Sequence, residues 1–155
     1  MKAKELMIGD LVMADVRTEE GTKHFNVRID GIDENHTLID GSCYVSWCSL
    51  DKQKDEWEYS QDLNPITLTE DILKANGFEA RGSNTFTRPF GKFFVVVELD
   101  YNDIEISKYY GIGTDDEECE YGSDIHFEEN IKVHELQHVL RLCGLDELAD
   151  NFKVE

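Results

Sequence analysis

Two histidines four residues apart are the side chains in this sequence whose spacing most clearly suggests chemistry. They belong to the segment His134-Glu135-Leu136-Gln137-His138, which has the pattern His-Glu-x-x-His. On a helix this spacing brings both imidazoles to one side, where they can bind one Zn²⁺, and the glutamate next to them can act as a general base. One interpretation is therefore a zinc-dependent hydrolase with His134 and His138 as metal ligands and Glu135 as the catalytic residue.

The apolar pattern of the surrounding helix favours a different interpretation. At 100° per residue, one arc of the helix collects the apolar residues Val133, Leu136, Val139, Leu140 and Cys143. His134, His138 and Arg141 lie on the opposite side, which an amphipathic helix turns to water. Arg141 would also hold a fixed positive charge beside the metal. We therefore expect no catalytic residue and no metal ligand here, and His138→Ala should change the stability by less than about 0.5 kcal/mol.

A catalytic zinc ion needs a third protein ligand as well. Cys143 lies about half a turn from His134 on the helical wheel and cannot supply it. The remaining candidates are Glu147 and Glu155 downstream, and His126, Glu128 and Glu129 upstream. Zinc stays the alternative cofactor, and no cofactor is the preferred expectation.

Three other groups of residues are weaker candidates for chemistry. Gly111-Ile112-Gly113 precedes acidic residues where a phosphate loop would need a helix with a lysine, so we interpret it as a turn. The acidic residues from Asp115 to Glu120 lack the spacing of a calcium loop, which favours a solvated loop. Cys43 and Cys48 point to opposite faces of a strand and are expected to be packed thiols.

The charge of the chain restricts its partners. The 155 residues carry 34 acidic and 15 basic side chains, a formal net charge of −19, and the excess of acid is present in both halves. Such a surface repels phosphate, so direct binding to nucleic acid or to an anionic membrane is disfavoured. The first residues show no signal-peptide core, and the longest apolar run, Phe93 to Val97, is far shorter than the roughly 20 residues of a membrane span. With four scattered cysteines, we expect a cytoplasmic protein with reduced thiols.

The elements that position these residues suggest an α+β fold. Short alternating strands are expected at 10–15, 25–29, 37–40 and 43–50, forming an N-terminal β meander that closes into a small SH3-like barrel. A polar linker at 51–64, with an edge strand, completes a first lobe of residues 1–64. The second lobe, 65–155, should hold an antiparallel sheet with two helices on one face.

Within this second lobe the first helix is expected to start after its N-cap Thr69 and to stop at Gly77. Strands are expected at 85–88, 92–99 and 104–109, and the apolar Phe93–Val97 should form a central strand covered on both faces. The histidine helix should run over 130–143, followed by a short turn at 146–152.

Three segments resemble a family of short uncharacterised proteins from phages and mobile elements of anaerobic gut bacteria. They are Glu5-Leu-Met-Ile-Gly-Asp-Leu-Val12, Pro65 to Leu73 with Asn76-Gly-Phe78, and Ile131 to Gly144, and they follow one another in the same order over nearly the whole chain. The resemblance implies a bacterial or phage cytoplasmic protein and no particular activity.

Taken together, these features favour a non-enzymatic accessory protein that acts through a protein partner. A zinc-dependent hydrolase is one alternative. The other is an acidic mimic of DNA, which would occupy the DNA site of a basic host protein. The sequence leaves the partner and the oligomeric state open.

Overall fold

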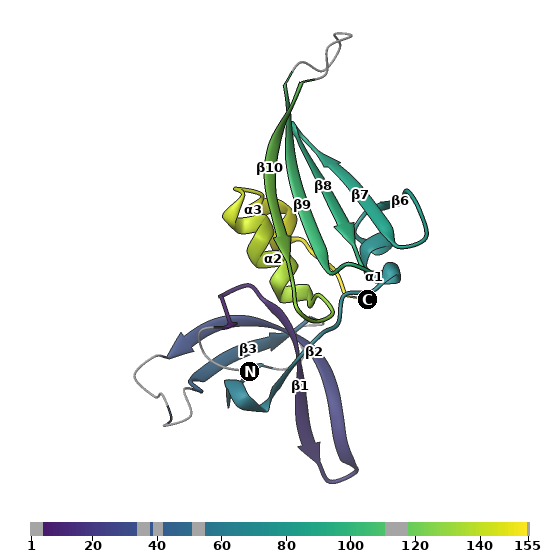
Figure 1. The fold of residues 1–155 in the computed structure, drawn as a ribbon. Coiled ribbons are helices and arrows are strands. Elements are labelled where there is room, and N and C mark those ends of the chain that lie inside the picture. Colours follow the sequence, from purple (N-terminus) through teal and green to yellow (C-terminus); the bar gives the residue numbers. More distant parts are fainter. Residues whose placement is uncertain (1–4, 34–37, 39–41, 51–54, 111–117, 155) are drawn as a thin grey trace.

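The chain folds into two antiparallel sheets with helices between them (Figure 1). The structure, a computed structural model, describes residues 5–33, 38, 42–50, 55–110 and 118–154. Its strands are β1 Leu11–Thr18, β2 Gly21–Asp33, β3 Tyr44–Ser49, β4 Asp55–Tyr59, β5 Leu63–Pro65, β6 Glu79–Ala80, β7 Thr85–Phe90, β8 Phe93–Glu98, β9 Asp103–Tyr110 and β10 Glu118–His126. Its helices are the short 3₁₀ helix η3 Ser60–Asp62, α1 Glu70–Ala75, α2 Val133–Leu142 and α3 Asp146–Asp150.

The N-terminal sheet has the strand order β4-β3-β2-β1-β5 and curls into a half-barrel, as expected from the meander pattern. Alternate residues of its strands point inward and form a core of their own. This core contains Val12, Val27, Val45 and the fully buried Trp47. The register of β2 against β3 shifts between Ile29 and Gly31. A bulge of this kind bends a strand and helps the sheet to curl.

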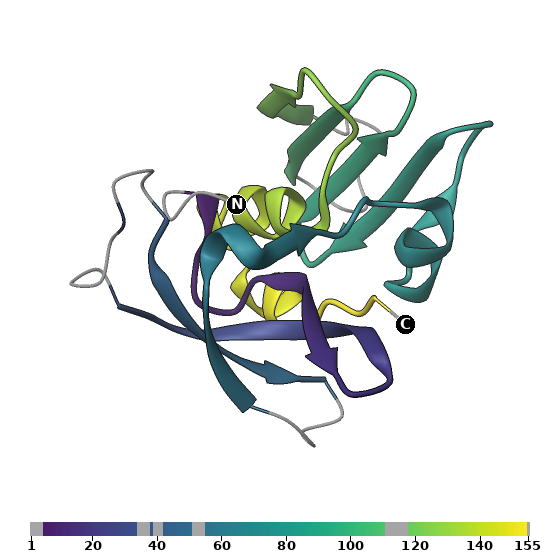
Figure 2. The same cartoon turned by 90° about the horizontal axis from the view of Figure 1, so that it is seen from below.

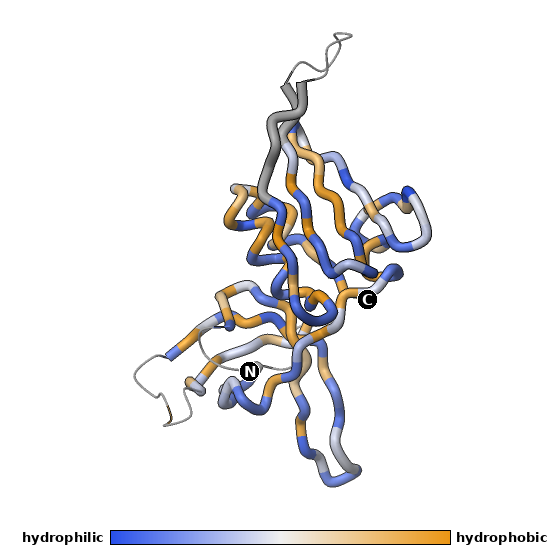
Figure 3. The backbone as a smooth tube through the Cα atoms, viewed as in Figure 1, coloured by the Kyte–Doolittle hydropathy of each residue, from blue (hydrophilic) through white to orange (hydrophobic). Residues whose placement is uncertain are grey.

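The C-terminal sheet has the order β10-β9-β8-β7-β6, so β8 is central, as predicted. Val95 and Val97 of β8 are fully buried beneath the helices, whereas Phe94 and Val96 on the other face are only half-buried. The expectation that β8 is covered on both faces was therefore wrong: among the described residues, helices pack on one face of this sheet. Figure 3 shows hydrophobic residues running along these strands and alternating with hydrophilic ones along the helices.

The predicted helix signals act as expected. The Thr69 hydroxyl accepts a hydrogen bond from the Ile72 amide, and α1 ends before Gly77, which has φ +73°. Leu68 and Leu73 lie in the same core. Among the described residues, no helix is long and apolar enough to cross a membrane.

Two predicted boundaries were wrong, and one predicted strand is not tested. The histidine helix begins at Val133 instead of residue 130, because its N-cap Lys132 is extended and the carbonyl of Ile131 accepts from the Leu68 amide, 2.9 Å away. The acidic segment expected to be a loop up to Glu120 is already strand β10 from Glu118, paired along β9. The strand expected at 37–40 falls outside the described residues except for Leu38, which belongs to no strand.

Helices α2 and α3 lie between the two sheets, which Figure 2 shows from below. The apolar arc of α2 packs on the C-terminal sheet: Leu136 and Leu140 are fully buried in one core with Phe86, Val97 and Ile104. Leu11, at the start of β1, belongs to the same core. The helix therefore meets the C-terminal sheet with one face and the N-terminal sheet with another.

Truncating this apolar arc should be costly. Leu136→Ala is expected to lower the free energy of unfolding by about 2 to 5 kcal/mol, because it leaves a cavity in the main core. Leu142 of the same helix is 80% exposed, so Leu142→Ala should cost less than about 0.5 kcal/mol. Denaturant unfolding of both variants measures the difference, and equal costs would contradict the assigned face.

Candidate functional site

The side of α2 that carries the histidines does not face water. His134 is 5% exposed and Gln137 is fully buried, because the chain entering β1 lies across this side of the helix. The expectation of a solvent-facing surface was therefore wrong. A wheel shows only that this side is polar, and it cannot show that a second sheet covers it.

The carboxylate of Asp10 is the centre of this contact. Asp10 is fully buried, and its Oδ2 accepts hydrogen bonds from His138 Nε2 at 2.8 Å and from the Met7 amide at 2.7 Å. Its Oδ1 accepts from Arg141 Nη1 at 2.9 Å. A carboxylate directly before β1 thus holds two side chains that are one turn apart on α2.

Gln137 makes a second set of bonds across the same contact. Its Oε1 accepts from the Leu11 amide at 2.9 Å, and its Nε2 donates to the carbonyls of Gly9 at 3.2 Å and Ala149 at 2.9 Å. Every polar atom of this buried amide therefore has a partner. Gln137 ties the start of β1 to both α2 and α3.

The close approach of chain and helix requires a glycine at position 9. Gly9 has φ +93°, and a Cβ there would lie 2.7 Å from Arg141 Nη2. Its carbonyl also accepts from Arg28 Nη1 at 2.8 Å. A larger residue would strain the backbone and push the Arg141 guanidinium away from Asp10. The segment Gly9-Asp10-Leu11, the three polar side chains His138, Arg141 and Gln137, and His134 are called the joint below.

Glu135, the expected general base of the zinc alternative, has a structural partner. Its Oε2 accepts from the Lys132 amide at 2.7 Å, which stabilises the first turn of α2. His138 Nε2 is likewise bonded to Asp10, and the Arg141 cation is bound to that same carboxylate. These contacts give the motif residues a role in folding that needs no metal.

His134 is the one member of the motif with an unsatisfied atom among the described residues. Its Nδ1 is buried without a hydrogen-bond partner, and its ring stands edge-on to His138 with 5.7 Å between centroids. Burial lowers the pKa of His134 to about 4, and this effect outweighs Asp10, which raises it. His134 is therefore neutral near pH 7.

The candidate third ligands in the described part of the chain are not gathered around the histidines as a metal site. His126 Nδ1 bonds to Asp103 at 2.6 Å with its side chain mostly exposed, Glu128 and Glu129 are exposed, and Glu147 lines a pocket beside α3. Glu155, the glycine pair 111–113 and the acidic residues 115–117 fall outside the described residues. Within the described part of the chain, no three His, Cys, Asp or Glu side chains are placed to hold a metal ion.

A second group of residues lies on the outer face of the N-terminal sheet. Tyr44 stacks on Trp57 with centroids 5.5 Å apart and 23° between the rings, and it also contacts Tyr59 at 5.1 Å. Trp57 and Tyr59 share a face of β4, and Trp57 is 51% exposed. Tyr44, Trp57 and Tyr59 are called the aromatic patch below.

The opposite face of β4 is acidic. Glu56 and Glu58 line a cleft of about 540 Å³ together with Asp15 and Asp62, and Arg17 is the cation among its lining residues. Burial raises the pKa of Glu58, and the nearby carboxylates of Asp62 and Glu56 raise it further. Strand β4 therefore presents aromatic rings on one face and carboxylates on the other.

Sequence reasoning missed Asp10 and Gln137, although one signal for them exists. Positions 134, 137, 138 and 141 are polar at i, i+3, i+4 and i+7, the spacing of a continuous stripe on a helix. A stripe of hydrogen-bonding residues with this period fits a second, polar contact as well as it fits solvent. Asp10 in turn stands beside a glycine immediately before a strand.

Removing the buried carboxylate of Asp10 should lower the free energy of unfolding far more than removing the exposed carboxylate of Asp150. Asp10→Ala leaves the mostly buried Arg141 without its main partner and should cost about 3 to 5 kcal/mol. Asp150, which bonds the same guanidinium at 3.2 Å, is exposed, so Asp150→Ala should cost less than about 1 kcal/mol. Loss of its charged hydrogen bond should make His138→Ala cost about 1 to 3 kcal/mol, above the value expected from the wheel. Chemical denaturation of the three variants measures these differences.

The depressed pKa of His134 predicts a pH dependence. As the pH falls below 6.5, His134 becomes protonated in the unfolded chain, whereas in the folded protein it stays neutral down to about pH 4. The free energy of unfolding therefore decreases as the pH falls through this window. From pH 7.5 to pH 5, His134 should lower the free energy of unfolding by about 2 kcal/mol. In His134→Gln, the free energy of unfolding measured against pH should lose this decrease of about 2 kcal/mol. His24→Gln, at an exposed histidine, should keep the decrease. Identical curves for wild type and His134→Gln would contradict the buried neutral state.

Comparison with known proteins adds no further assignment. No protein-family model, no curated protein and no solved structure matches this chain. The resemblance to short phage proteins therefore stays a prediction, and the joint and the aromatic patch have to be interpreted from their own geometry.

Proposed function

We propose that the protein is a non-enzymatic interaction module that binds a basic protein partner at the aromatic patch. The observation that carries the proposal is the exposed Trp57 stacked on Tyr44. Tryptophan and tyrosine are the residues most enriched among the energetic centres of protein interfaces. Their stacking also holds the rings in place before a partner arrives, which lowers the entropy lost on binding.

The position of the patch suits an extended partner. Strand β4 is the last strand of its sheet, and it pairs with β3 through Tyr44–Tyr59 and Ser46–Trp57. An edge strand can accept one more strand by backbone hydrogen bonds, while alternate side chains of the partner reach the two faces of the sheet. One set of these side chains would contact the aromatic patch and the other set the acidic cleft.

Charge then selects the kind of partner. The chain carries a net charge of −19, and Glu56 and Glu58 are on the same strand as Trp57. Complementary charge speeds association and excludes acidic partners. The favoured partner is a protein with an extended segment in which lysine or arginine alternates with apolar residues.

The competing hydrolase interpretation has less support. Glu135 is bonded to the amide of Lys132 at the first turn of α2, and His138 is bonded to Asp10. Arg141 adds a fixed positive charge bound to the same Asp10 carboxylate. A zinc ion would have to displace these contacts. The joint therefore supports a protein whose histidine motif stabilises the fold.

A binding experiment with matched variants tests the proposal. Wild type, Trp57→Ala and Tyr101→Ala are used as bait in bacterial lysate, Tyr101 being a 67% exposed aromatic residue in the turn between β8 and β9. We expect basic proteins that wild type and Tyr101→Ala retain and Trp57→Ala loses, with retention falling as salt rises. Partners that are retained equally by all three would contradict the patch. If duplex DNA displaces a partner that is itself a DNA-binding protein, the acidic DNA-mimic alternative gains instead.

Elemental analysis separates the module from the hydrolase. Protein purified without chelator should carry well under one equivalent of zinc, because Glu135 and His138 have other partners. Stoichiometric zinc that disappears in both His134→Ala and His138→Ala would favour the hydrolase, provided circular dichroism shows both variants folded.

A further inference from the structure

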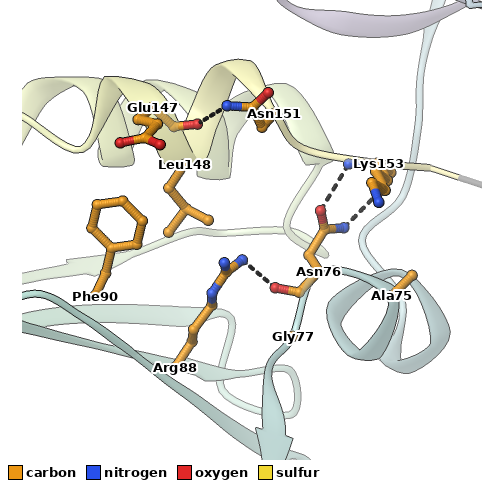
Figure 4. A pocket seen from close by; sticks show the side chains of 9 residues that line it. All are labelled: Ala75, Asn76, Gly77, Arg88, Phe90, Glu147, Leu148, Asn151 and Lys153. Carbon is orange, nitrogen blue, oxygen red and sulfur yellow. Dashed lines mark hydrogen bonds between the residues drawn. The ribbon is translucent and has the colours of Figure 1, made fainter.

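A pocket of about 320 Å³ opens between the end of α1, strand β7 and α3 (Figure 4). Its strand β7 belongs to the C-terminal sheet, whereas the aromatic patch lies on the N-terminal sheet. The size of the pocket falls at the lower end of the range for small-molecule sites. Arg88 of β7 points into it beneath Leu148, with Phe90 on one side and the Asn76 turn on the other (Figure 4). The pocket belongs neither to the joint nor to the proposed partner surface.

Arg88 is a cation at a position where the fold places apolar residues. In β7 the residues Phe86, Arg88 and Phe90 alternate onto one face, and Arg88 is directly opposite Val95, which is buried beneath the helices. The guanidinium is thus half-buried on the helix-covered face of the C-terminal sheet. Burial removes part of the hydration of this guanidinium and so lowers the pKa of Arg88.

The charge of Arg88 has no acidic partner within the described chain. Its Nη1 donates to the carbonyl of Asn76 at the end of α1, and no carboxylate oxygen of a described residue lies within 4.0 Å. Arg81 and Arg141, by contrast, are paired with Glu79 and Asp10. In a chain with 34 acids and 15 bases, an unpaired and half-buried cation is unexpected, since buried charges are normally paired.

The remaining walls define what fits beside this cation. Phe90 and Leu148 supply apolar surface, and Lys153 adds a second positive charge. The acid at this pocket is Glu147, an exposed residue of α3. A guanidinium has five N–H donors in a planar fork that matches a carboxylate, and one carbonyl bond leaves most of them free.

From these contacts we infer that the pocket binds an organic carboxylate with a small apolar group, its carboxylate held by Arg88 and its apolar group against Phe90 and Leu148. The carboxylate comes from a free small acid or from the C-terminus of a peptide, because both offer the same chemistry. Arg88 also bonds the carbonyl of Asn76, the C-cap residue of α1, and this bond continues in the bound state through Nη1.

Titration followed by ¹H–¹⁵N NMR tests the site with defined probes. We expect 3-phenylpropionate to shift the Arg88 Nε–Hε resonance and the amides of Gly77 and Phe90 in a saturable way. The neutral amide 3-phenylpropanamide, which has the same shape without the charge, should bind at least about tenfold more weakly, the factor that corresponds to one charged contact. This comparison uses the unaltered protein and does not depend on any variant folding.

Two variants and one further probe complete the experiment. Arg88→Gln should weaken the binding of 3-phenylpropionate at least about tenfold. Arg81→Gln, at an exposed arginine near the same sheet, should leave this binding unchanged. If Arg88→Gln does not fold, Lys153→Gln should still weaken binding measurably. N-acetylphenylalanine separates the sources: tighter binding than 3-phenylpropionate assigns a peptide C-terminus, and weaker or equal binding assigns a small acid.

The inference is overturned if neither carboxylate gives saturable shifts, or if the neutral amide binds as well as the acid. This outcome would leave the aromatic patch untouched, because Trp57 lies on the other sheet.

Discussion

The buried carboxylate of Asp10 connects the two halves of this molecule. It stands at the start of β1, where the backbone of the N-terminal sheet begins, and it accepts hydrogen bonds from His138 and Arg141 of a helix that packs on the other sheet. A buried charge is tolerated only when it is paired and hydrogen-bonded, so these donors have to be in place whenever the protein is folded. The orientation of α2, and with it the contact between the sheets, depends on this carboxylate.

The same constraint explains how a metalloprotease-like motif can serve a structural purpose. Spacing of four residues on a helix brings two side chains to one face whatever they bind, so the pattern that suits a zinc ion also suits a carboxylate and the backbone around it. Here Glu135 closes the first turn of α2, Gln137 bonds three backbone groups and His138 bonds Asp10. The amphipathic helix thus has two buried faces, one apolar and one polar.

The two surfaces that we propose for binding lie outside the joint. The aromatic patch lies at the free end of the N-terminal sheet, and the Arg88 pocket lies on the helix side of the C-terminal sheet. They differ in chemistry: rings beside carboxylates at the first, a cation beside apolar walls at the second. The two proposed surfaces share no residue with the joint.

The sequence by itself determined the features that depend on neighbours in the chain. Alternating residues predicted the meander, and the continuous apolar run Phe93–Val97 predicted the central strand β8. Thr69 and Gly77 bounded α1, and the apolar arc of α2 marked its contact with the sheet. Such signals are local, because caps, turns and periodicity act over a few residues. β10 escaped prediction because its acidic residues follow no apolar alternation, and its pairing is set by β9.

Only the tertiary structure decided what the polar residues do. Asp10 and His138 are 128 residues apart, and no local pattern reports which distant segment will cover the polar side of a helix. Likewise, Arg88 in its strand looks like any alternating charged residue until α1 and α3 close over that face and leave it half-buried. Burial and pairing of charges arise from contacts between segments far apart in the chain, so the histidine motif could be found in the sequence but its role could be read only from the fold.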